Sequence, residues 1–186
     1  EGSAMTDDGI IDSRFHPEKQ GFDINIGGCA YGQPANYFSP YQNGTISDGP
    51  DNEYLTDRLG TEACQFIELN KERPFLLYLS TYTVHTPLQA PAVTVENHNG
   101  NKYLAMIEKL DENVGRVLDK IKSLGLEKNT LMVFYSDNGG LWGNPPLRAN
   151  KGSLFEGGIR VPLIFSFPGN IPSGTQNDVA VISPDL

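Results

Sequence analysis

The chain has 186 residues, of which 38% are hydrophobic and 20% charged, a composition typical of one ordinary globular domain. This composition excludes a collagen, a coiled coil and a disordered tail. Fourteen basic and 23 acidic side chains give a net charge of −9, which argues against a nucleic-acid partner because phosphate-backbone binding needs a positive surface. No run of about 18 apolar residues is present, so we expect no membrane-spanning segment.

The first half of the chain begins with irregular sequence and continues into one helix. Residues 1–54 are rich in Gly, Pro, Asn and Tyr and show no sustained period, which predicts loops with at most one short strand. A helical pattern follows, with Thr56 or Asp57 as its N-cap and Pro74 as its stop. Its apolar side is formed by Leu59, Ala63, Phe66, Ile67 and Asn70.

Three apolar runs and a long helix make up the rest. The runs 75–80, 131–136 and 161–167 have the length of strands, and their continuity favours strands buried on both faces of a parallel sheet. The helix begins near Asn101 and stops at Gly125. Its apolar face comprises Leu104, Ile107, Leu110, Val114, Val117, Leu118, Ile121 and Leu124. Alternating helices and strands predict an α/β sheet with right-handed crossovers.

Open α/β sheets bind ligands beyond the carboxyl ends of their strands, and two polar loops leave such ends here. The loop after Ser80 contains His85, whose imidazole is suited to give a proton to a leaving oxygen. A structural histidine that caps loop carbonyls is the alternative. The loop after Ser136 contains Asp137, Asn138 and Lys151.

Asp137 and Asn138 carry hard oxygen donors directly after a strand, followed by Gly139 and Gly140, which let the chain turn away. This pattern favours a Ca²⁺ or Mg²⁺ site, although a simple turn has the same sequence. Lys151 stands in a glycine-rich stretch that is suited to cradle an oxyanion. The alternative for Lys151 is an ordinary surface lysine.

Cys29 and Cys64 are compatible with one disulfide or with two buried thiols. Glu156 and Arg160 lie four residues apart, so we expect them to pair across one helical turn.

The order and context of these sites resemble a known family. The segments PFLLYLSTYTVHTPLQAP (74–91), LMVFYSDNGG (131–140) and LRANKGSLFEGGIRVPLIFSFPG (147–169) are similar to the type I sulfatases of the alkaline-phosphatase-like superfamily. GFDINIGG (21–28) also resembles a segment of those enzymes. The resemblance covers roughly 15–186 and identifies this range as a partial sulfatase catalytic domain, with 1–14 as a leader of uncertain origin.

The resemblance implies an α/β fold, namely part of an alkaline-phosphatase-like sheet flanked by helices. It implies that Asp137 and Asn138 are ligands of a divalent metal, usually Ca²⁺, that Lys151 contacts the sulfate and that His85 lies at the leaving-group side. The family's nucleophile is a formylglycine hydrate, and its substrates here would be a sulfated small molecule or a sulfated carbohydrate. Family members are usually exported to the periplasm, the cell exterior or the lysosome.

The chain also departs from the family pattern. The Cys/Ser-x-Pro-x-Arg signature that carries the nucleophile is absent, since neither Cys29 nor Cys64 is followed by Pro and Arg at the required positions. Residues 14–17 stand where the family has a Lys-x-His element. Asp7 and Asp8 resemble the family's first metal-binding pair, but the strand that normally precedes this pair is absent. The favoured interpretation is that these residues belong to a fortuitous leader.

These departures predict a domain truncated at both ends, with strand edges left unpaired and available for self-association. We therefore expect a sulfatase whose full-length form hydrolyses sulfate esters and whose present chain is inactive alone. Two alternatives remain. One is a non-catalytic metal- or anion-binding remnant, or a module completed by a partner. The other is a phosphoester hydrolase of the same superfamily.

Overall fold

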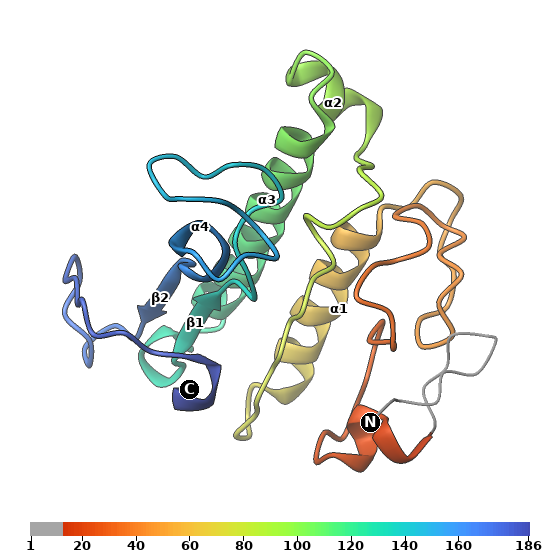
Figure 1. Cartoon of the computed structure of the whole chain (residues 1–186). Coiled ribbons are helices and arrows are strands. Elements are labelled where there is room, and N and C mark those ends of the chain that lie inside the picture. Colours follow the sequence, from red (N-terminus) through yellow and green to blue (C-terminus); the bar gives the residue numbers. More distant parts are fainter. Residues whose placement is uncertain (1–12) are drawn as a thin grey trace. The chain divides into compact units, whose positions relative to one another are not determined.

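The structure, a computed structural model, describes residues 13–186 (Figure 1). The chain divides into unit 1, which ends at Leu124, and unit 2, Gly125–Leu186. Each unit is described by itself. The proposed metal role of Asp7 and Asp8 and most of the leader 1–14 lie outside the described residues.

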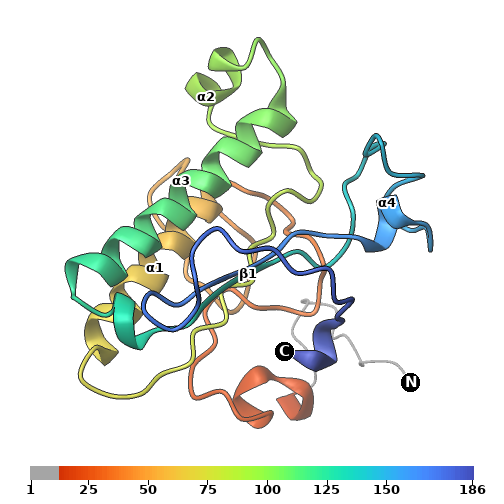
Figure 2. The same ribbon diagram turned by 90° about the vertical axis from the view of Figure 1, so that its left-hand side faces the viewer.

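Unit 1 is built on the two predicted helices, which run side by side (Figure 2). Helix α1 spans Leu55–Asn70 and buries Leu59, Ala63 and Ile67 on one side, as the periodicity predicts. Its predicted cap is wrong. The N-cap is Tyr54, without a side-chain cap, and the Thr56 hydroxyl instead bonds the Thr83 hydroxyl at 2.5 Å.

Helix α3 spans Lys102–Ser123 and confirms both predicted ends. The Asn101 side chain accepts hydrogen bonds from the amides of Tyr103 and Leu104, and Gly125 follows the helix with a φ of +70°. The helix buries Ala105, Met106 and Asn113, so the predicted apolar face is only partly confirmed, with Ile121 as its one buried member. Its members Leu104, Ile107 and Leu118 are 44%, 40% and 43% exposed.

The two helices touch where Gly60 of α1 faces Asn113 of α3. The side-chain NH₂ of Asn113 donates to an Asp57 carboxylate oxygen at 2.7 Å, and the side-chain oxygen of Asn113 accepts from the Arg116 guanidinium at 2.7 Å. Lys109 adds an ion pair to Asp57 at 3.0 Å. A Cβ at position 60 would stand 2.1 Å from the Asn113 oxygen, so this close helix contact depends on glycine.

The predicted strand 75–80 is an extended segment without a partner strand among residues 13–186. Its side chains alternate between half-buried and exposed, so only one side is covered. On the covered side, the ring of Phe75 meets that of Phe66 edge-on at 5.7 Å. On the other side, Leu76 and Tyr78 are 76% and 74% exposed. Burial on both faces is therefore wrong, and self-association through this edge stays a prediction.

The irregular segment before α1 is held by buried tyrosines instead of secondary structure. Between residues 20 and 54 the structure has only an isolated bridge, which joins Phe38 to Tyr54. Tyr37, Tyr41 and Tyr54 are 0%, 0% and 3% exposed. Burial raises the pKa of Tyr54 to about 12 and raises the pKa values of Tyr37 and Tyr41 still further. Their hydroxyls therefore stay protonated and able to donate even at alkaline pH values at which an exposed tyrosine ionises.

Unit 2 contains two strands, β1 (Met132–Tyr135) and β2 (Leu163–Ser166), in two of the predicted places. They pair antiparallel, with Met132 opposite Ser166 and Tyr135 opposite Leu163, so the predicted parallel arrangement is wrong for this pair. An apolar run carries no information on strand direction. The predicted burial on both faces is also wrong for these strands, because Val133, Phe134, Ile164 and Phe165 are 46%, 39%, 57% and 40% exposed. Pro162 directly precedes β2, which agrees with a proline at a strand start.

The loop between β1 and β2 folds back on itself through close backbone contacts. The Gly139 amide donates to the Gly158 carbonyl at 2.9 Å, and the Gly157 amide donates to the Arg148 carbonyl at 2.8 Å. A Cβ on Gly139 would stand 1.9 Å from the Gly157 carbonyl oxygen, and one on Gly157 would stand 2.1 Å from the Ala149 carbonyl oxygen. Glycine is therefore required for this packing.

The remaining helical elements are short. Helix α2 (Ala92–Asn97) is tied to α3 through His98, which follows it and whose Nε2 lies 2.5 Å from a Glu108 carboxylate oxygen. Cys29 and Cys64 are free thiols. Among the helices of residues 13–186, none has the length and hydropathy needed to cross a membrane. The other elements are α4 (Glu156–Ile159) and the 3-10 helices Ser13–Phe15, Pro17–Lys19, Glu127–Asn129 and Ser183–Asp185.

Replacing Gly60 by Ala tests the helix contact. An alanine normally stabilises a helix interior relative to glycine, but here it would displace Asn113 from its bonds. We expect Gly60→Ala to lower the free energy of unfolding by about 1–3 kcal/mol. Gly115→Ala on α3 is the matched control, because nothing lies within 4 Å of its added Cβ. It should be neutral or stabilising by up to about 1 kcal/mol. Urea unfolding followed by circular dichroism measures both, and equal effects would contradict the contact.

Replacing Gly139 by Ala tests the loop of unit 2. The added methyl would collide with the Gly157 carbonyl, so the bond from the Gly139 amide to the Gly158 carbonyl should open. We expect hydrogen exchange at the amides of residues 139, 151 and 157 to accelerate by at least about tenfold, which corresponds to about 1.4 kcal/mol. Gly143→Ala, whose Cβ meets nothing within 4 Å, should leave these amides unchanged. Unchanged exchange in Gly139→Ala would show that the loop does not depend on this contact.

Candidate functional site

Two predicted metal ligands follow β1 directly. Asp137 is exposed and Asn138 is half-buried. The Ser136 hydroxyl donates to the Asn138 carbonyl at 3.0 Å, which closes the turn at the end of the strand. Within residues 13–186, neither the Asp137 carboxylate nor the Asn138 side-chain amide has a hydrogen-bond or ion-pair partner. Their oxygens are therefore free to coordinate a cation.

Lys151 is joined to this turn through the backbone. Its amide donates to the Gly140 carbonyl at 3.0 Å, and the Asn150 side chain donates to the Leu141 carbonyl at 2.8 Å. Lys151 as a whole residue is half-buried, and its ammonium has no hydrogen-bond or ion-pair partner in the described part of the chain. The structure thus brings Asp137, Asn138 and Lys151 into one loop system.

Helix α4 supports the Lys151 stretch. Glu156 and Arg160 pair at 3.5 Å across one turn, as their spacing predicts, although both side chains are well exposed. A second contact was not anticipated from the sequence. The Arg148 guanidinium lies over the ring of Phe155, 3.6 Å from its centroid, and so bridges the two ends of this loop by a cation–π interaction.

His85 belongs to unit 1 and lies in the loop between 75–80 and α2. Its ring is half-buried, and Nδ1 lies 3.2 Å from both the carbonyl and the hydroxyl oxygen of Thr86. Nε2 has no partner among residues 13–186. The backbone of His85 is fully engaged, since its amide donates to the Tyr82 carbonyl at 2.7 Å and its carbonyl accepts from the Tyr37 hydroxyl at 3.0 Å.

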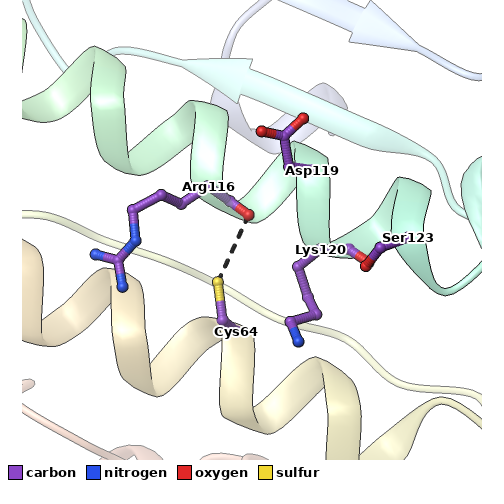
Figure 3. A pocket seen from close by; sticks show the side chains of 5 residues that line it. All are labelled: Cys64, Arg116, Asp119, Lys120 and Ser123. Carbon is purple, nitrogen blue, oxygen red and sulfur yellow. Dashed lines mark hydrogen bonds between the residues drawn. The ribbon is translucent and has the colours of Figure 1, made fainter.

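One surface depression of unit 1 is lined by none of the four predicted residues. It is a shallow hollow of about 430 Å³ beside helices α1 and α3, shown in Figure 3. The Cys64 thiol at its floor donates to the Arg116 carbonyl at 3.7 Å, and Lys120 at its rim pairs with Glu68 at 3.2 Å. Arg116 donates to the Asn113 side-chain oxygen and to the Thr61 hydroxyl, so both cations of the hollow are bonded to groups outside its lining. This arrangement suits a solvated helix surface better than a ligand site.

Sequence reasoning missed the residues that hold the His85 loop. Tyr37 and Tyr54 bond to this loop from more than 30 positions away in the chain. Neither residue lies in a periodic element, and the only available signal was the density of tyrosine in a segment without regular structure.

A family model described as Sulfatase matches residues 8–185. The chain is 37% identical over 149 residues to a sulfatase of Formosa agariphila, an alignment that covers 67% of this chain and 27% of that protein. It is 30% identical to N-acetylgalactosamine-6-sulfatase of Mus musculus, with 87% of this chain and 36% of that protein covered. It is 33% identical to steryl-sulfatase of Homo sapiens, with 87% and 30% covered.

The chain is also similar to the crystal structure of Ps i-CgsB in complex with k-i-k-neocarrahexaose. The TM-score is 0.70 at 32% sequence identity, and the match covers 88% of this chain and 43% of that one. The chain thus spans 27% to 43% of the length of these relatives. With the family model covering nearly all of its residues, the chain belongs to the sulfatase family and forms part of that family's α/β, alkaline-phosphatase-like fold.

Proposed function

We propose that this chain is part of a sulfate-ester hydrolase, to which it supplies a share of a calcium site and two groups that contact the sulfate ester. One observation carries the proposal. The polar ends of Asp137, Asn138 and Lys151 have no partner among residues 13–186, although the backbone of their loops is held by hydrogen bonds. Membership of the sulfatase family supports the same assignment.

The donor chemistry of Asp137 and Asn138 fits a calcium ion, because carboxylate and amide oxygens are the hard ligands that Ca²⁺ prefers. Ca²⁺ takes about six to eight oxygens, so two residues provide only a share of its shell. Within residues 13–186, no three His, Cys, Asp or Glu side chains gather into a metal-binding group. A bound calcium ion would supply positive charge beside the sulfate oxygens.

Lys151 is the proposed cation for the sulfate itself. Its ammonium has no partner among residues 13–186, and an ammonium forms charge-assisted hydrogen bonds with the oxygens of an anion such as sulfate. The backbone bond to Gly140 places Lys151 in the same loop system as the proposed metal ligands. The Lys151 ammonium would thus bind the negatively charged sulfate oxygens.

His85 is the proposed proton donor. Its Nδ1 is close to the Thr86 oxygens, whereas Nε2 is without a partner in the described residues and is the atom available to protonate a departing alcohol oxygen. Protonation of the leaving oxygen lowers the barrier to cleavage of the sulfur–oxygen bond.

The nucleophile is not encoded in these 186 residues. The family uses a formylglycine hydrate made from a Cys or Ser, and neither Cys29 nor Cys64 stands in the required signature. We therefore propose that the whole protein hydrolyses sulfate esters, whereas these residues alone bind calcium and sulfate without turnover. The relatives' names point to a sulfated amino sugar and to steryl sulfates, so the proposed substrate is a sulfated carbohydrate or a sulfated small molecule.

Calorimetric titration of the chain with Ca²⁺ and with inorganic sulfate tests this assignment. We expect weak calcium binding, with Kd at or above about 10⁻⁴–10⁻³ M, that is lost in Asp137→Asn. Lys151→Ala should weaken sulfate binding by about tenfold or more, because a charge-assisted contact is removed. The exposed residues Asp178 and Lys128 provide matched controls, Asp178→Asn and Lys128→Ala, which should bind like the unmodified chain.

An aryl sulfate assay completes the test. Without the nucleophile, the chain should show no multiple turnover with or without Ca²⁺. Calcium-dependent multiple turnover would refute the proposal of binding without catalysis. Binding that is equally strong in the Asp137 and Lys151 variants and in the controls would show that the ions bind elsewhere.

A further inference from the structure

A single buried hydroxyl holds the turn that carries His85. Tyr37 is fully buried, and its hydroxyl lies 2.6 Å from the Tyr82 carbonyl and 3.0 Å from the His85 carbonyl, both of which accept from it. The same turn is closed by the His85 amide, which donates to the Tyr82 carbonyl at 2.7 Å. Both backbone polar groups of His85 are therefore bonded, one of them to Tyr37.

Tyr37 also fixes the far end of the loop. Its backbone amide donates to the Gln89 side-chain oxygen at 2.8 Å, and the hydroxyl of the neighbouring Tyr54 donates to the Gln89 carbonyl at 2.8 Å. The rings of Tyr37 and Tyr54 stack with centroids 5.8 Å apart. The loop is thus attached before and after His85 to one aromatic pair.

The near end has its own attachment through Tyr82. Its hydroxyl donates to the Gly27 carbonyl at 2.7 Å and lies 3.0 Å from the Cys29 thiol. Between these fixed ends lies His85, a half-buried residue whose Nε2 has no partner among residues 13–186. A loop with a rigid backbone and one available imidazole nitrogen is suited to present that nitrogen at a defined place.

We propose that Tyr37 is a positioning residue for His85: its buried hydroxyl fixes the 82–85 turn and so sets where the imidazole meets a bound sulfate group. This inference rests on the proposed role of His85 in sulfate-ester hydrolysis. Tyr37 itself contacts no substrate, because it is fully buried beneath the loop. The hydroxyl acts through the backbone carbonyls of Tyr82 and His85.

The test compares Tyr37→Phe with Tyr41→Phe in the full chain by nuclear magnetic resonance. Tyr41 is equally buried, but its hydroxyl donates to Glu53 at 2.7 Å and does not touch the loop. We expect Tyr37→Phe to accelerate hydrogen exchange at the His85 amide at least about tenfold and to shift the His85 ring signals. Tyr41→Phe should leave both unchanged. Equal effects of the two variants would overturn the proposal.

Inorganic sulfate serves as the binding probe and separates this proposal from the previous one. Sulfate should shift the His85 ring signals of the unmodified chain, with an apparent affinity roughly three- to tenfold lower in Tyr37→Phe and unchanged in Tyr41→Phe. If sulfate leaves the ring unaffected in the unmodified chain, the role of His85 fails, while the exchange data still decide whether Tyr37 fixes the turn.

A measurement on the unmodified chain covers the case in which Tyr37→Phe does not fold. The hydroxyl proton of Tyr37 should give a resolved, slowly exchanging signal with a nuclear Overhauser effect to the His85 amide proton. A Tyr37 hydroxyl proton that exchanges freely with water would contradict the proposed contact.

Discussion

The loops of unit 1 depend on hydrogen bonds that buried tyrosine hydroxyls donate to backbone carbonyls. Buried carbonyls and amides need partners, and the segment before α1 has almost no regular structure to provide them. Tyr37, Tyr54 and Tyr82 provide partners across long sequence distances, to carbonyls at 82, 85, 89 and 27. Tyrosine hydroxyls are protonated at neutral pH, and burial raises the pKa of each of these three further, so they stay donors well into the alkaline range. The position of His85 follows from this network.

In unit 2, glycines allow the loop backbone groups to hydrogen-bond to one another. Gly139, Gly157 and Gly158 let backbone approach backbone so closely that amides bond carbonyls across the loop. The outcome is a loop whose main chain is satisfied, while the polar ends of Asp137, Asn138 and Lys151 have no partner among residues 13–186. This arrangement is compatible with the ion site proposed above.

Sequence reasoning succeeded where the determining signals are local. Helix α3 was predicted with both ends, because Asn101 and Gly125 act on the nearest turn. The strand at 131–136 was found from its apolar run, but its antiparallel pairing was not, since strand direction depends on the partner. Segment 75–80 shows the same limit, because an apolar run forms a strand only beside another strand.

The same distinction between local and long-range signals applies to the residues of the candidate site. Asp137, Asn138 and Lys151 were recognisable because strand ends and glycine-rich stretches mark them in the sequence, and the structure places them in one loop system. Tyr37 could not be predicted, because its contacts to Tyr82 and His85 span 45 and 48 positions and leave no periodic trace. Long-range contacts from irregular segments are the part of such a site that only three-dimensional structure reveals.

The most direct test of the central claim is a crystal structure of the chain grown with calcium and sulfate. The account predicts a calcium ion coordinated by oxygens of Asp137 and Asn138 and a sulfate ion in contact with the Lys151 ammonium. Ions bound only at other places, with these three side chains turned away from them, would contradict it.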